Sequence, residues 1–362
     1  MPFSSKQLLP FIFGAIAPCA AFAETTFDFY GQINFGLFNV DDGTETESFF
    51  VDNDNSNTRI GFIYSEGLSN GATAKFHFES ALGFNGSAAA TITNNDGGID
   101  LDRTELRKLE VIYESNSWGT VSVGQGSMAA DGTAEADLSG TSVITYSGIP
   151  DLAGSFAFRP AGGVPSGTTV GDAFSNLDGG RRFRGRYDTS SLNGFKGSVS
   201  YGEEFLNEPD DRNFTDVAVR YANDYGDMTV NAQLGYQWID DDSGDEEILA
   251  GSFALLHEPS GFNVALSSGA QQQGDASYVY AKLGYQADWF TIGRTFLSID
   301  FYDGSDFSAD GSDSSSYALA AVQKVERYGV EIYAAFRSHE YDEAGTNFED
   351  IDVFALGARW KF

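Results

Sequence analysis

Apolar and polar residues alternate with a period of two along almost the whole chain. In residues 27–37, Phe27, Phe29 and other apolar side chains share one face, whereas Gln32 and Asn34 lie on the opposite face. The same alternation returns further along, in residues 72–79 and 230–238. Because side chains of a β-strand point to opposite faces in turn, the pattern predicts an all-β protein.

The two faces of these segments carry different kinds of side chain. One face holds Gln, Asn, Lys, Arg and Glu beside Gly and Ser, and the other ends in Tyr, Trp and Phe. A wet interior and an aromatic girdle at each membrane interface would have these compositions. Backbone groups in hydrocarbon must all be paired, which requires a closed barrel. We therefore predict a transmembrane antiparallel β-barrel of about 16 strands, formed by residues 24–362 as one domain.

The connections between the predicted strands alternate in kind. Short ones, at residues 188–194, 223–227, 258–261 and 325–328, alternate with long acidic ones, at residues 41–57, 240–247, 303–314 and 340–350. Outer-membrane barrels have short periplasmic turns and longer external loops. The final amphipathic segment ends on Phe362, and a terminal aromatic residue is the sorting signal typical of such barrels.

Residues 1–23 have the pattern of a secretory signal peptide. Lys6 provides the positive start, a short apolar run follows, and Ala23 ends a small-residue cleavage site. The run is too short to span a membrane, and Pro18 before Cys19 argues against a lipidated N-terminus. Cleavage after Ala23 would leave a chain without cysteine, which excludes disulfides and thiol chemistry.

The chain is strongly acidic. It has 53 acidic residues against 21 basic ones, and loss of Lys6 with the signal would leave 20 basic residues. This charge makes nucleic acid a poor partner. It favours solubility in salt, with divalent cations between crowded carboxylates as a second interpretation.

Three short motifs, in this order, resemble the general porins of Gram-negative bacteria, in their alphaproteobacterial form. Residues 29–34 (FYGQIN) are similar to the first strand of that family and residues 57–62 (NTRIGF) to its second. Residues 118–124 (WGTVSVG) resemble the step that leads into its third loop. The resemblance covers essentially residues 24–362. It implies a homotrimer in the outer membrane, in contact with lipids and lipopolysaccharide, that passes small hydrophilic solutes and ions.

The resemblance also implies that the third loop folds into the barrel, where its acidic residues face basic residues of the wall. Residues 125–180 fit this constriction loop, and we expect a hairpin within it around residues 143–159. Asp131, Glu135 and Asp137 are its first acidic residues and the candidates for the loop side. The alternative is that they are ordinary solvated loop carboxylates.

Strand parity predicts part of the basic wall. Phe183 and its alternate neighbours belong on the lipid face, so Arg182, Arg184 and Arg186 point into the lumen. An outward arginine near the bilayer midplane would cost roughly 2–4 kcal/mol. The alternative is a strand end lying among lipid headgroups. If the row lines the constriction, mild cation selectivity should strengthen when Arg184 is replaced by alanine.

Three further basic residues are candidates for this wall. Arg59 points inward by the same parity, because Ile60 and its alternate neighbours face lipid. Arg107 and Lys108 both lie near the place where the family has a wall arginine, and parity favours Lys108.

The sequence favours a passive diffusion pore over two alternatives. A substrate-selective channel is the closer one, but the lumen face lacks the aromatic ladder of sugar-specific pores. A barrel enzyme is less favoured, because His77, His257 and His339 are far apart and lack a nucleophile motif. We expect no required cofactor, with divalent cations such as calcium at the acidic loops as the metal hypothesis.

Overall fold

The alternating segments form antiparallel strands that close on themselves. A computed structural model describes residues 25–95, 98–207, 211–241 and 244–362. The predicted signal peptide therefore lies outside the described residues. Within them, 16 of the 19 strands form the wall of one barrel, which confirms the predicted fold. These are β1 (Thr25–Asp41), β3 (Arg59–Gly67), β4 (Thr73–Ala81), β5 (Leu106–Ser115), β6 (Gly119–Ser127), β8 (Arg181–Asp188), β9 (Phe195–Glu203), β10 (Asn213–Tyr225), β11 (Met228–Asp240), β12 (Glu246–His257), β13 (Phe262–Gln271), β14 (Ser277–Phe290), β15 (Gly293–Ser305), β16 (Asp313–Val325), β17 (Val330–Glu343) and β19 (Ile351–Lys361).

The first and last wall strands close the barrel. The first part of β1 pairs with β3, and the part from Gln32 onward pairs with β19. Gly31 and Phe362 exchange two backbone hydrogen bonds of 2.9 and 3.1 Å at this seam. Closure pairs the backbone of both edges, as a hydrocarbon environment requires.

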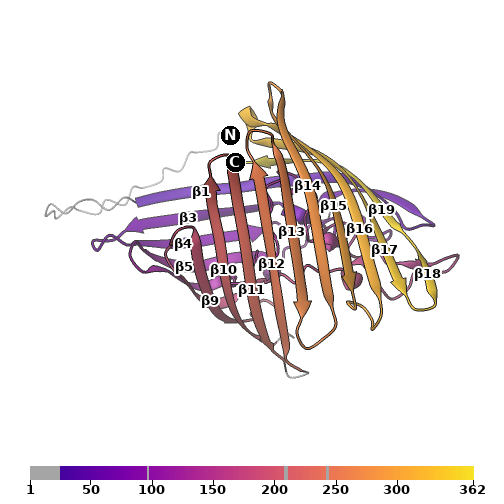
Figure 1. The fold of residues 1–362 in the computed structure, drawn as a ribbon, viewed down its shortest axis with the longest axis horizontal. Helices are drawn as coiled ribbons and strands as arrows, with labels where there is room; N and C mark the ends of the chain where they lie inside the picture. Colours follow the sequence, from indigo (N-terminus) through magenta and orange to yellow (C-terminus); the bar gives the residue numbers. More distant parts are fainter. Residues whose placement is uncertain (1–24, 96–97, 208–210, 242–243) are drawn as a thin grey trace, which may run out of the picture.

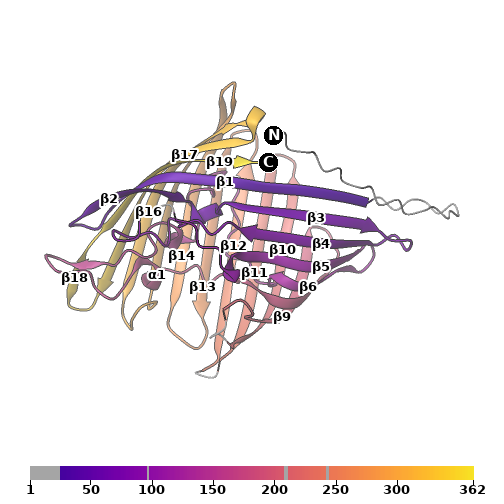
Figure 2. The ribbon, with the colours of Figure 1, turned by 180° about the vertical axis from the view of Figure 1, so that it is seen from behind.

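The wall has a short half and a tall half. Strands β3–β6, β8 and β9 have 8–10 residues, whereas β10, β11 and β14–β17 have 13 or 14. At about 3.4 Å per residue, this is a difference of roughly 10–20 Å in strand length. Figure 1 shows the tall strands in front, and Figure 2 shows β1 and the short strands from behind.

Side-chain exposure alternates along the strands as the sequence predicts. In β10, Val217 and Val219 are exposed, whereas Asp216 and Ala218 are buried. Large apolar side chains such as Phe29 (58% exposed) therefore cover the outside, where lipid would contact them. Inward side chains are polar or small, except where apolar ones pack against the segment between β6 and β8.

The segment between β6 and β8 packs against the inner face of the wall. The backbone N–H of Ala129 donates to Ser200 Oγ (2.7 Å), and the hydroxyls of Thr141 and Ser298 are 2.7 Å apart. Since Ser200 and Ser298 are inward positions of β9 and β15, much of residues 128–180 packs inside the barrel, whereas residues 161–165 are exposed. We call residues 128–180 the inner loop.

The inner loop does not contain the hairpin that we expected at residues 143–159. This stretch instead forms turns and a 3₁₀ helix, Ile149–Asp151, and a four-residue helix, α1 (Val170–Ala173), follows it. The segment is anchored by long-range contacts, because the two-residue β7 (Arg159–Pro160) pairs with β18 (Thr346–Glu349). Local pairing within the loop is limited to an isolated antiparallel bridge between Ala157 and Thr169, and the strand β7 pairs with a distant strand.

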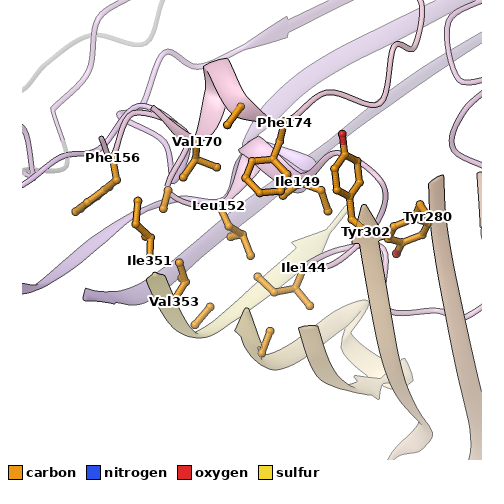
Figure 3. Close-up of a cluster of buried hydrophobic side chains, with 14 of the residues drawn as sticks. Ile144, Ile149, Leu152, Phe156, Val170, Phe174, Tyr280, Tyr302, Ile351 and Val353 are labelled. Carbon is orange, nitrogen blue, oxygen red and sulfur yellow. The ribbon is translucent and has the colours of Figure 1, made fainter. Parts of the chain in front are cut away.

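A hydrophobic core lies between the inner loop and the wall (Figure 3). From the loop it includes Ile144, Leu152 and Phe174, and from the wall it includes Tyr302 and Ile351, all with at most 2% exposure. Burial of apolar surface contributes about 25 cal/mol per Å², so the loop is held by packing as well as by hydrogen bonds.

Three strands remain outside the wall: β2 (Thr46–Asp52), which pairs with the end of β1, and β7 and β18. The remaining 3₁₀ helices are Asp54–Ser56, Arg103–Glu105 and Glu326–Tyr328. No helix in the described ranges is long and apolar enough to cross a membrane.

Candidate pore constriction

A polar cavity of about 630 Å³ lies between the inner loop and the wall. Its charged lining separates by origin, since the basic residues come from wall strands and nearly all the acidic ones from the loop. In the described part of the chain the basic residues are Arg59, Arg107, Arg181 and Arg359, and the acidic ones are Asp54, Asp131, Glu135, Asp137, Asp151 and Asp178. The cavity thus has a basic wall side and an acidic loop side.

Three of the four cavity arginines are paired with carboxylates of the wall. Glu79 on β4 accepts a hydrogen bond from Arg107 Nε (2.7 Å) and lies 3.7 Å from Arg59 Nε. Arg359 Nε donates to Glu331 on the neighbouring β17 (2.7 Å). These carboxylates fix the guanidinium groups and neutralise part of their charge.

Arg181 differs from the other cavity arginines. It is the first residue of β8, it is half-buried, and no ion pair within 4.0 Å joins it to another residue of the described ranges. Its full positive charge therefore faces the cavity.

The structure brings all three predicted loop carboxylates to the cavity. Asp137 Oδ2 is 2.7 Å from Nζ of Lys282, a side chain on β14 with 0% exposure. Burial alone would raise the pKa of Asp137, but the charge and hydrogen bond of Lys282 outweigh it and lower the pKa. Asp137 is thus a permanent anion, neutralised by Lys282.

Other carboxylates of the cavity have raised pKa values. Burial raises the pKa of Asp151 to about 7 and that of Asp54 to about 6. Burial, followed by repulsion from neighbouring carboxylates, raises the pKa of Glu135, and burial also raises that of Asp178. Burial and crowding of like charges disfavour full ionisation, so these four carboxyls titrate near neutral pH.

Two of the six predicted basic residues, Arg59 and Arg107, line this cavity. Arg182, Arg184 and Arg186 alternate with exposed Phe183, as parity predicts, but they are not among its lining residues. Arg184 is 4% exposed and forms a very short ion pair with Glu110. Arg182, Arg184 and Arg186 instead form ion pairs with carboxylates along the wall.

The remaining contacts of this row lie along the wall and at the start of the inner loop. Arg186 pairs with Asp188 (2.8 Å) and donates to the carbonyl of Met128 (2.7 Å). Arg182 Nη1 is 3.4 Å from a carboxylate oxygen of Glu204. The positions of these arginines therefore favour a structural role in anchoring the loop.

Of the adjacent pair Arg107 and Lys108, the structure places Arg107 at the cavity, contrary to the parity argument. The pairing of β4 with β5 shifts register between Glu79 and Ser80, which leaves Arg107 as an extra residue beside Glu79. Its side chain turns to that carboxylate. Lys108 is described but does not line the cavity.

Several cavity residues escaped the sequence argument. Parity could have found Arg359, since it lies between outward residues Ala358 and Trp360 of the terminal strand. Parity would have excluded Arg181, which shares the register of Phe183 but lies at the strand end, where the chain turns into the loop. Asp151 and Asp178 depend on the path of the loop, which carries no periodic signal.

No group of three or more potential metal ligands is close enough to hold an ion in the described residues. The acidic stretch at residues 240–247 is only partly covered, because residues 242–243 lie outside the described ranges.

The sequence profile of the Gram-negative porins matches residues 12–344. The chain belongs to this family. A search of curated proteins finds no match. The chain is an outer-membrane porin, a β-barrel channel for passive diffusion. The alphaproteobacterial type stays a prediction.

Solved porin and channel structures share the fold at low identity. The anion-selective porin from Comamonas acidovorans is 16% identical, with a TM-score of 0.63 over 94% of this chain and 100% of that one. Pseudomonas putida OprB is 9% identical, with a TM-score of 0.60 over 94% of each chain. The trimer form of OmpT from Vibrio cholerae is 14% identical, with a TM-score of 0.56 over 93% and 99%.

Proposed function

We propose that ions and small hydrophilic solutes pass through the cavity between the wall arginines and the loop carboxylates, which acts as the constriction of this porin. The separation of charge by origin carries the proposal. Opposed rows of charge create a transverse field across a narrow aqueous passage, in which dipolar solutes orient. The hydrogen bonds and core under the inner loop keep the acidic row in place.

Cysteine labelling tests this pathway, because Cys19 is the only cysteine of the full chain. In a Cys19→Ser background, Ser142→Cys places a thiol at the exposed cavity lining. Attachment of a bulky charged thiol reagent should lower single-channel conductance. The matched control is Ser69→Cys, at the exposed turn between β3 and β4. Unchanged conductance after complete labelling at residue 142 would place the pathway elsewhere.

We infer mild cation selectivity for this constriction. The lining has more carboxylates than arginines, and the wall neutralises much of the charge of Arg59, Arg107 and Arg359. The Comamonas porin is described as anion-selective, and that property is its own. A reversal potential of anion-selective sign in a potassium chloride gradient would contradict our inference.

We also infer a homotrimer of diffusion channels without catalytic activity. β1 and the short half of the wall expose Phe27, Phe29 and Val111, an apolar surface of the kind that subunits bury. The trimer form solved for OmpT, which has a similar fold, supports this inference. Chemical cross-linking in native outer membranes should give a trimer, and a monomer alone would refute the assembly.

The calcium hypothesis remains a proposal for the acidic external loops, where carboxylate oxygens could bind the ion or bridge it to lipopolysaccharide phosphates. Chelation should then lower the thermal stability of the assembled protein. No change on chelation would leave these residues as solvated carboxylates.

A further inference from the structure

A chain of hydrogen-bonded side chains crosses the inner wall from β1 to β5. The hydroxyl of Tyr30 on β1 lies 2.7 Å from His77 Nε2 and 2.8 Å from Glu79 Oε2, both on β4. To reach them, the Tyr30 ring passes over β3 at Gly61. A Cβ at this position would lie 2.6 Å from the ring carbon and hydroxyl of Tyr30, so the glycine leaves the necessary space.

The second ring nitrogen of His77 extends the chain to β5. His77 Nδ1 is 3.2 Å from Glu110 Oε1, and Glu110 in turn pairs with Arg184 on β8. At the other end, Glu79 holds Arg107 and lies near Arg59. The chain therefore connects a buried ion pair with two arginines of the proposed constriction.

The number of protons on these side chains determines which of the hydrogen bonds can form at the same time. An ionised carboxylate only accepts, so Nδ1 must carry a proton to bond Glu110. In a neutral ring Nε2 is then an acceptor. His77 and Glu79 both need the single proton of the Tyr30 hydroxyl, and only one of them receives it.

A second proton on His77 removes this competition. Nε2–H then donates to the Tyr30 oxygen, and the Tyr30 hydroxyl donates to Glu79. Every contact in the chain has one donor and one acceptor.

We propose that Tyr30 and His77 are positioning residues that hold Glu79, and through it Arg59 and Arg107, and that the hold is complete when His77 carries both ring protons. This inference rests on the proposed constriction. Other charged groups on this inner face include Arg184 on β8, Lys108 opposite Glu79 on β5, and Lys75 on β4, which is paired with Glu114 (2.8 Å). When His77 carries only one ring proton, it competes with Glu79 for the Tyr30 hydroxyl, so the wall arginines are then less firmly held.

Tyr30→Phe is the decisive variant, because it removes one hydroxyl and no charge. Reversal potentials of the full-length wild type, Tyr30→Phe, His77→Gln and the double variant are measured from pH 5 to pH 8. The loop carboxylates contribute a pH-dependent shift in all four proteins. We expect both single variants to lose part of the wild-type shift and the double variant to lose no more than His77→Gln alone. A Tyr30→Phe profile identical to wild type would overturn the proposal.

His257→Gln is the matched control. His257 lies at the end of β12 and contacts Ser260 of the turn (2.7 Å), away from this chain. Its removal should leave the profile of reversal potential against pH unchanged.

Nuclear magnetic resonance of ring-labelled histidine gives a readout independent of conductance, since the chain has three histidines. The doubly protonated signal of His77 should disappear at a lower pH in Tyr30→Phe than in wild type. An unaltered signal would refute the role of Tyr30 even if labelling at residue 142 blocks the pore. A changed signal without block would instead refute the proposed pathway.

Discussion

Replacing Arg181 with glutamine should make the pore more cation-selective. Arg181 faces the cavity without an ion-pair partner in the described ranges, whereas the other cavity arginines are partly neutralised. The variant therefore removes one uncompensated positive charge and retains a polar side chain of similar length.

The size of the effect follows from the cavity. A sphere of 630 Å³ has a radius of about 5 Å, so a permeating ion passes within about 5 Å of the guanidinium. Two unit charges interact at this distance by about 0.8 kcal/mol in water, and salt with a screening length of about 8 Å reduces this to about 0.4 kcal/mol. Since cation and anion feel opposite effects, the permeability ratio should shift by roughly fourfold.

The assay is the reversal potential in planar bilayers under a potassium chloride gradient. Arg294→Gln is the control, because Arg294 lies at the beginning of β15, half exposed, and pairs with Asp288 rather than facing the cavity. The shift for Arg181→Gln should shrink at high salt, where screening is stronger. If the two variants give the same reversal potential as wild type, the charge of Arg181 is not at the constriction.

Three further outcomes are expected. Arg184→Gln should act on stability more than on selectivity, because it leaves the buried carboxylate of Glu110 without its partner. Loss of one partner of a buried pair costs about 3–5 kcal/mol, measurable by thermal unfolding, and a changed selectivity with unchanged stability would contradict this. Lys282→Met should lower the free energy of unfolding by a similar amount, because it leaves Asp137 unpaired. It should also increase current noise as the inner loop loosens. A quiet, stable channel would show that the Lys282–Asp137 pair does not anchor the loop. Acidification from pH 8 to pH 5 should weaken cation selectivity, because carboxyls with raised pKa values, such as Asp151 at about 7, take up protons in this range. Asp151→Asn should reduce that change, and an identical pH profile would exclude this residue.

The wall of the barrel could be predicted from sequence because each strand position has one of two environments. Phe29 and Phe183 face outward and Asn34 and Arg184 inward in the structure, as the alternation requires. Lipid on one side and the interior on the other make this two-fold choice energetically strict.

The details of the constriction could not be predicted in the same way. Choosing Arg107 over Lys108 depends on a local register shift, which alternation does not reveal. Arg184 was expected at the constriction because it points inward, but its contact with Glu110 depends on which strand lies two places away. The inner loop is fixed by contacts between residues far apart in the sequence, such as Asp137 and Lys282, so its path has no local signal.

The hydrophobic core under the inner loop makes the passage eccentric. The loop rests on β9–β17 and on the first residues of β19 and fills that part of the lumen, so the open space adjoins β3, β5, β8 and the far end of β19, which provide the arginines. Mutations at inward positions should therefore fall into two groups with different effects. Substitutions at positions such as Tyr302 would change folding yield and leave ion flow alone, whereas those near Arg59 would alter ion flow in a fully folded channel.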